Sequence, residues 1–356
     1  MGKGNIFGVG RRVKQRIYSE PMGRESVCTA QQMRDQEILE KYRPHFLKIE
    51  YELEQALSSK VDAIAEIGRH SLLGHGKRLR PLLFILCCNL FQYQSQELYK
   101  LSVVFEYIHT ASLLHDDVLD NAEVRRKRPS ANRLWGNHAA VLEGDFLYSK
   151  AFSIAVNYAN QAFFRKLTET TTIMAEGQVL ELLHTRNWAL TPKTYFDIIT
   201  AKTAVLISAA CACGGIISGA SQQEVRLLEQ FGMNMGIAFQ LMDDLLDYIS
   251  TEEVFGKPVG KDLREGKVTL PLIYTLSGIS EQERASLQSL LAGDQLNEHT
   301  HARIMNLVKS NGALARVRRE AETYTEKAAE VLDPFPDSET KENLLELNQY
   351  IIHRAF

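Results

Sequence analysis

Two aspartate-rich stretches constrain this chain more than any other feature. Each has the pattern Asp-Asp-x-x-Asp within an apolar run, at positions 116–120 and again at 243–247. In a helix of 3.6 residues per turn, positions i and i+4 lie on one face and position i+1 lies about 100° round, so each pattern directs three carboxylates into one sector. The sequence therefore predicts two helices with compact acidic clusters: Asp116, Asp117 and Asp120 on one, and Asp243, Asp244 and Asp247 on the other.

These acidic clusters require a cationic partner. An ionised carboxylate in apolar surroundings is costly when it is unpaired. Mg²⁺ is a hard cation that takes oxygen ligands, and waters and substrate phosphates usually complete its shell. Basic residues that suit phosphate oxygens follow both motifs, at 125–128 and at Lys257, Lys261 and Lys267. One motif could equally be a solvated helix face, but two copies favour a Mg²⁺ site for a phosphorylated substrate, with the six aspartates as metal ligands.

The composition is that of an ordinary globular protein. The 356 residues carry a formal net charge of −3 and are 45% hydrophobic, which argues against a nucleic-acid binder and against a disordered chain. The five cysteines have no zinc-like spacing, so we expect reduced, mostly buried thiols in a cytoplasmic protein. Residues 1–30 are basic and Gly-rich without an apolar signal run, and we expect a disordered tail there.

Helical periodicity runs through the remainder of the chain. Apolar residues recur at three- and four-residue spacings from about residue 38, without an alternating strand pattern. We therefore predict one all-α domain over residues 31–356, a helical bundle with its site between facing helices. Residues 204–220 are apolar, but their small side chains favour a tightly packed interior helix over a transmembrane segment. Gly177, inside another helical stretch, also indicates close packing.

With these motifs the chain resembles the trans-isoprenyl diphosphate synthase (polyprenyl synthetase) family, and most of all its long-chain members that make quinone side chains. Both aspartate motifs are present, and the resemblance extends from about residue 35 to the C-terminus. It implies an all-α bundle of the isoprenoid synthase type with a central active-site cavity, a Mg²⁺ cofactor and a homodimer. It also implies a prenyltransferase that condenses an allylic diphosphate with successive isopentenyl diphosphates and whose product partitions to the membrane.

The resemblance assigns roles to further residues. The turn at 74–81 matches the family pattern Gly-Gly-Lys-x-x-Arg, except that His75 replaces the first Gly. The implied isopentenyl diphosphate-binding residues are Lys77, Arg80, His109 and Arg126. The implied allylic diphosphate-binding residues are Arg125, Lys202, Thr203, Gln240 and Lys257. The implied catalytic residues are Asp116, Asp117, Asp120, Asp243 and Lys202. Without the resemblance, a lone helical His such as His109 would more often be a packed core residue.

Product length depends on the residues before the first motif. The growing chain should run along that helix towards its N-terminus, past the positions four, five and eight residues before Asp116, which are Ser112, Ala111 and Ile108. Short-chain family members commonly carry a bulky aromatic residue at the first or second of these positions, whereas both are small here. We therefore expect a product of about thirty to fifty carbons and favour eight prenyl units. The candidates for the tunnel floor are Phe152, Phe163, Phe164 and Leu167.

Three other functions fit parts of the pattern. A terpene cyclase shares the first motif and the helical fold, but cyclases usually replace the second motif and lack the basic turn, and this chain has both. A non-catalytic subunit that stabilises a partner synthase typically loses aspartates, and all six are present. A geranylgeranyl diphosphate synthase is the closest alternative, because small residues before the motif permit a long product without requiring it.

Overall fold

Helices make up most of the structure, a computed structural model that describes residues 38, 40–73, 76–158, 160–249, 259–291 and 297–353. The helices around the predicted site are α4 (Leu79–Asn89), α5 (Leu98–Leu119), α8 (Gln161–His184), the π-helix η1 (Thr200–Ala204), α10 (Val205–Ile217) and α11 (Gln222–Ile249). The other helices are α2 (Arg43–Ala56), α3 (Asp62–Leu72), α6 (Ala131–Trp135), α7 (Asn137–Asn157), α9 (Pro192–Ile199), α13 (Lys261–Arg264), α14 (Leu270–Gly278), α15 (Glu281–Leu291), α16 (Glu298–Ser310), α17 (Ala313–Val331) and α18 (Glu339–His353). The prediction of an all-α fold is confirmed.

One short hairpin follows the first aspartate motif, and the periodicity gave no sign of it. Strands β1 (Val124–Arg125) and β2 (Arg128–Pro129) pair antiparallel, and they are the sole strands in the described part of the chain. Arg126 and Lys127 form the turn with φ of 52° and 63°. Both central residues of a two-residue hairpin turn of type I′ need positive φ, which explains why the chain reverses here. The hairpin turns the basic run back towards α5.

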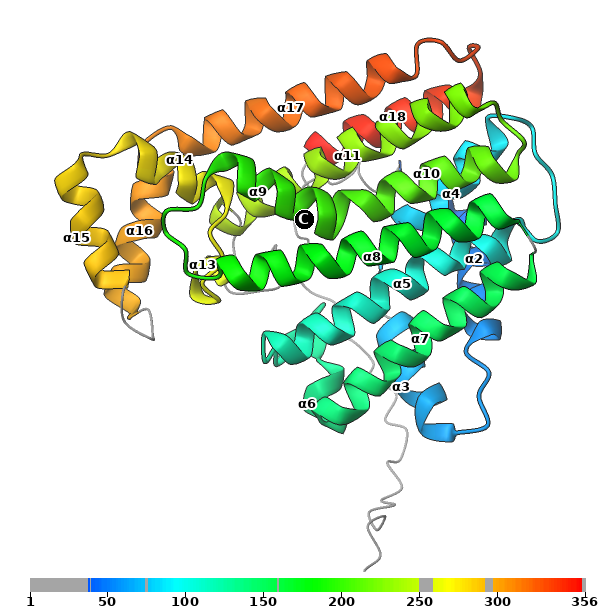
Figure 1. Cartoon of the computed structure of the whole chain (residues 1–356), viewed down its shortest axis with the longest axis horizontal. Coiled ribbons are helices and arrows are strands. Elements are labelled where there is room, and N and C mark those ends of the chain that lie inside the picture. Colours follow the sequence, from blue (N-terminus) through cyan, green and yellow to red (C-terminus); the bar gives the residue numbers. More distant parts are fainter. Residues whose placement is uncertain are drawn as a thin grey trace, which may run out of the picture.

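Helix α10 lies at the centre of the bundle. It contacts α4, α8 and α11, and Figure 1 shows these helices side by side with α5. Its side chains contribute to two clusters of buried residues, with Ile207 in the cluster around α11 and Leu206 in the cluster around α5. The small residues predicted to pack tightly are buried, so the interior-helix interpretation of this run agrees with the structure. The continuous helix 192–217 is long and apolar enough to span a membrane, but 67% of its most apolar window is buried inside the protein.

Glycines allow the helices beside the site to approach closely. A Cβ at Gly236 of α11 would lie 2.6 Å from Ala204 Cα of η1, and a Cβ at Gly177 of α8 would lie 2.7 Å from Ala201 Cβ. Real Cβ atoms do not come that near, so a larger residue at either position would push η1 outward. The close packing expected from Gly177 therefore occurs, and it fixes η1 between α8 and α11.

Some predictions lie outside the described residues. These are the disordered tail at 1–30, the role of Lys257 and the His75 replacement. Four of the five cysteines are described, and all four are buried free thiols, as expected.

Candidate active site

The three aspartates of the first motif have three different partners. They lie at the C-terminal end of α5, where Asp120 caps the helix. Asp117 Oδ1 accepts hydrogen bonds from Arg125 Nε and Nη2 at 2.9 and 2.5 Å. Asp116 Oδ2 lies 3.5 Å from Lys202 Nζ, and Asp120 Oδ2 accepts a 3.0 Å hydrogen bond from Lys267 Nζ. Asp117 thus holds the hairpin, while Asp116 and Asp120, one turn apart, face the ammonium groups of Lys202 and Lys267.

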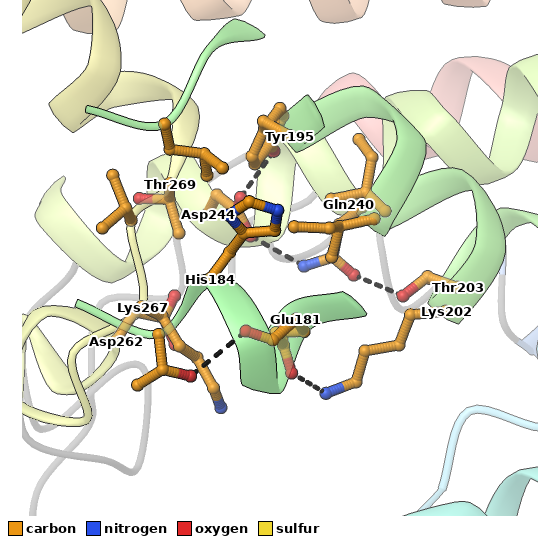
Figure 2. Close-up of a pocket in the computed structure, with 15 residues that line it drawn as sticks. Glu181, His184, Tyr195, Lys202, Thr203, Gln240, Asp244, Asp262, Lys267 and Thr269 are labelled. Atoms are coloured by element: carbon orange, nitrogen blue, oxygen red, sulfur yellow. Dashed lines mark hydrogen bonds and ion pairs between the residues drawn. The ribbon is translucent and has the colours of Figure 1, made fainter. Parts of the chain in front are cut away.

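The second motif on α11 is more deeply buried. Asp244 accepts hydrogen bonds from Tyr195 Oη at 2.6 Å and from Gln240 Nε2 at 2.7 Å (Figure 2), and burial raises its pKa well above the usual range. Asp247 accepts backbone N–H bonds from Lys261 and Asp262 at 3.2 and 3.1 Å, which anchors the turn into α13. Asp243 is the one aspartate of this motif that is not fully buried.

The carboxylates fit a divalent ion that the substrate completes. In the part of the chain that the structure describes, no three His, Cys, Asp or Glu side chains are grouped closely enough to hold a metal by themselves. Mg²⁺ is usually held by one or two carboxylates together with substrate phosphates. Asp116 and Asp120 supply such a pair of hard oxygen ligands, and each already faces a positive charge. This donor set suits Mg²⁺ or Ca²⁺ and not a soft metal.

Polar side chains from α8, η1 and α11 line the cavity beside these aspartates (Figure 2). Lys202 lies on η1, and its Nζ contacts Glu181 Oε2 at 2.5 Å. Thr203 Oγ1 donates to Gln240 Oε1 at 2.9 Å, which orients the amide towards Asp244. A π-turn in a helix shifts the direction of its side chains and frequently marks a functional site. Three residues predicted for the allylic diphosphate, Lys202, Thr203 and Gln240, therefore line one cavity.

The lysines of this cavity stay protonated. Burial lowers the pKa of Lys202, but the charges of Glu181 and Asp116 outweigh burial and raise it overall. Burial likewise disfavours the charged form of Lys267, and Asp262 and Glu265 raise its pKa above the usual range. The cavity therefore contains two fixed positive charges that an anionic substrate can share with the aspartates.

A second basic cluster surrounds the N-terminus of α4. Burial lowers the pKa of Arg80 to about 10 and also lowers that of Arg126. Burial and the positive charges of Arg80 and Arg126 lower the pKa of His109 well below its usual value. Lys77 Nζ lies 5.4 Å from the ring centroid of Tyr350 on α18. Like charges crowded in this way favour a bound anion, as the predicted isopentenyl diphosphate site requires.

The predicted product-length residues lie in the core beside α8. Ile108 and Ala111 are fully buried, and Ser112 Oγ donates to the carbonyl of His109 at 2.8 Å. Ile108 and Ala111 belong to the same buried cluster as Phe163 and Leu167. Phe152 and Phe164 pack against that cluster, with their ring centroids 6.1 Å apart. The four candidates for the tunnel floor therefore share one apolar region with the helix that carries the first motif.

Sequence reasoning missed several residues of the site. Glu181 and Tyr195 contact predicted site residues, but an isolated Glu and Tyr carry no local signal. Lys267 is one of the basic residues after the second motif, but its pairing with Asp120 joins positions 147 residues apart and has no local signal. Arg78 is a third basic residue between Lys77 and Arg80, and only its buried ion pairs distinguish it from them.

The fold and the site define a class of protein. An all-α bundle with two Asp-Asp-x-x-Asp helices, whose first motif pairs with lysines that line a polar cavity beside the second, is the arrangement of an isoprenyl diphosphate synthase. Residues 61–308 match the polyprenyl synthetase family model. The chain belongs to the polyprenyl synthetase family and is a prenyltransferase.

Individual relatives agree with this assignment over most of the chain. The chain is 36% identical to octaprenyl diphosphate synthase of Escherichia coli strain K12, covering 85% of this chain and 93% of that protein. It is 34% identical to heptaprenyl diphosphate synthase component 2 of Geobacillus stearothermophilus, covering 86% and 95%. Polyprenyl synthase of Caulobacter crescentus, solved with calcium and isoprenyl diphosphate, superimposes with a TM-score of 0.86 at 33% identity, covering 90% of this chain and 98% of that one. Other relatives include nonaprenyl and geranylgeranyl diphosphate synthases.

Proposed function

We propose that this protein is a long-chain trans-polyprenyl diphosphate synthase that condenses an allylic diphosphate with successive isopentenyl diphosphates. The proposed product has about thirty to fifty carbons, with octaprenyl favoured, and supplies quinone side chains. The observation that carries the proposal is the pair of small residues before the first motif, Ala111 and Ser112, beside an apolar core. The octaprenyl and heptaprenyl relatives support the same product range.

In this proposal each substrate has its own group of binding residues. Lys202, Thr203, Gln240 and Arg125 bind the allylic diphosphate, and Lys77, Arg80, His109 and Arg126 bind isopentenyl diphosphate. The proposed cofactor is Mg²⁺, held by Asp116, Asp120 and Asp243 with Asp117, Asp244 and Asp247 assisting, and when bound it neutralises charge on the diphosphate leaving group. Lys257, outside the described residues, completes the allylic group in this proposal.

The side chains of the cavity promote departure of the pyrophosphate. Lys202 and Lys267 supply positive charge that is already oriented where negative charge develops as the allylic carbon–oxygen bond breaks. The double bond of isopentenyl diphosphate then forms the new carbon–carbon bond, and the proton lost from that unit passes to the released pyrophosphate. His109 is a poor candidate for the base, because burial and the surrounding arginines lower its pKa well below the usual value.

We propose that two copies of the chain form a homodimer through α7 and α8. Large apolar side chains are exposed there, among them Leu142 at 66% and Leu183 at 73% exposure, with Val141, Val179 and Leu182. Exposed large apolar side chains on two helices that contact each other are typical of a protein–protein interface. We expect Leu183→Glu to shift sedimentation towards the monomer, and an unchanged dimer would exclude this face as the interface. A partner subunit is the alternative occupant, since one relative is a synthase component.

Product analysis tests the proposed function directly. The purified protein is incubated with farnesyl diphosphate, radiolabelled isopentenyl diphosphate and Mg²⁺, and the dephosphorylated products are separated by chain length. A ladder that ends near forty carbons supports the proposal. Products that stop at twenty carbons would make the chain a geranylgeranyl diphosphate synthase, as in one relative. Absence of product would favour a partner-dependent subunit.

A further inference from the structure

Arg78 lies between Lys77 and Arg80 of the proposed isopentenyl diphosphate site, but its side chain binds protein carboxylates and a backbone carbonyl. It is the N-cap of α4 and has a left-handed backbone with φ of 48°. Its side chain is 1% exposed and forms ion pairs with Glu50 of α2 at 2.6 Å and Glu106 of α5 at 2.8 Å. Its Nη2 also donates to the carbonyl of Leu72 at the end of α3. All three guanidinium nitrogens are thus engaged by protein groups.

These contacts tie the turn to three helices at once. A left-handed conformation is unfavourable for a residue with a Cβ, so it persists only where surrounding contacts hold it. The planar guanidinium fork reaches Glu50, Glu106 and the end of α3 from one side chain, which a point-charge ammonium cannot do. Lys77 and Arg80 are close to Arg78 in the chain. The contacts of the Arg78 side chain therefore fix the backbone that carries both residues.

Arg78 also pairs with Glu106, the carboxylate that would otherwise attract the neighbouring Arg80 and Arg126. Burial lowers the pKa of both Arg80 and Arg126, and the charge of Glu106 is the largest influence that opposes burial at each. Glu106 is itself 2% exposed, so its charge acts through a poorly hydrated region. Within the described residues, Arg80 Nε has no hydrogen-bond partner. While Glu106 is paired with Arg78, the guanidinium of Arg80 stays available to an anion.

We propose that Arg78 is a positioning residue for the isopentenyl diphosphate site, which it serves by fixing the turn and by holding Glu106 away from Arg80 and Arg126. The proposal rests on the proposed function. It predicts that changes at Arg78 affect the two substrates unequally. A purely structural residue would instead lower the amount of folded enzyme and leave both KM values unchanged.

Steady-state kinetics of Arg78→Lys provide the test. We expect the KM for isopentenyl diphosphate to rise about tenfold, because small misplacements of binding groups are costly, while the KM for the allylic substrate stays within about twofold. Glu50→Gln is the second variant, because Glu50 is 41% exposed and the buried pair with Glu106 is retained. We expect its KM for isopentenyl diphosphate to rise about threefold. If Arg78→Lys fails to fold, Glu50→Gln decides the question.

Two further variants separate this inference from the proposed function. Lys166→Met is the matched control, since it removes an ion pair of 2.8 Å with Glu229 elsewhere in the bundle and should leave both KM values unchanged. Lys77→Ala should raise the KM for isopentenyl diphosphate. If Lys77→Ala does so while Arg78→Lys and Glu50→Gln match the control, the inference is wrong and the proposed function stands. If Lys77→Ala has no effect in an active enzyme, the site assignment fails and the inference fails with it.

Discussion

Glu143 imposes a pH-dependent cost on folding that can be measured by one substitution. It lies on α7, is 1% exposed, and neither carboxyl oxygen has a hydrogen-bond partner among the described residues. Its carboxyl faces α3, where a Cβ at Gly68 would come within 2.9 Å of Oε1. Burial raises the pKa of Glu143 from 4.5 to about 7. A buried acid of this kind prefers to remain protonated.

The sign of the pH effect follows from the raised pKa. Below pH 4.5 the carboxyl is protonated in both the folded and the unfolded chain, so it imposes no ionisation cost. Between pH 4.5 and about 7 the unfolded chain loses the proton and the folded chain retains it, so the free energy of unfolding falls as the pH rises. Above pH 7 both states are ionised and the penalty is constant, at most about 3 kcal/mol from the size of the pKa change.

Glu143→Gln removes the ionisation and retains the shape of the side chain. We expect the stability difference between the variant and the original chain to grow in favour of the variant from pH 5 to pH 8, by at most about 3 kcal/mol. Urea unfolding at constant protein concentration measures it, because dissociation of an oligomer would otherwise contribute. Glu169→Gln, at an exposed position on α8, is the control. A stability difference for Glu143→Gln that does not change with pH would refute the reasoning.

Three further substitutions test the site. Ala111→Tyr places an aromatic ring at a fully buried position in the proposed product path, and we expect a shorter product on chain-length analysis; an unchanged distribution would exclude that path. Lys267→Gln removes the cation that donates a hydrogen bond to Asp120. We expect kcat/KM for the allylic substrate to fall about 10- to 100-fold while the KM for isopentenyl diphosphate stays unchanged. Equal effects on both substrates would contradict this role. Gly177→Val would force a Cβ to 2.9 Å from the backbone N of Lys202. We expect the free energy of unfolding in urea to fall by about 1–3 kcal/mol and the KM for the allylic substrate to rise. A stable variant with normal kinetics would show that η1 has room to move.

The sequence alone was sufficient for the class of fold and the chemistry. Helical periodicity and the i, i+1, i+4 spacing of the aspartates are local properties, so they predicted the two acidic helices without any tertiary information. The residue types then limited the ligand to a hard cation with phosphates. Residue roles such as those of Lys202 and Thr203 came from the family resemblance, since as isolated residues they carry no signal.

Only the tertiary structure decided which partner each charged group has. Three aspartates of identical type and spacing on α5 pair with Arg125, Lys202 and Lys267, and the last two lie on segments that follow α5 at a distance in the chain. Arg78 is buried between α2 and α5, and Glu143 is buried against α3, although both look like ordinary surface residues in the sequence. Charge pairing and burial depend on how non-adjacent helices pack, and a periodic pattern carries no information about that packing.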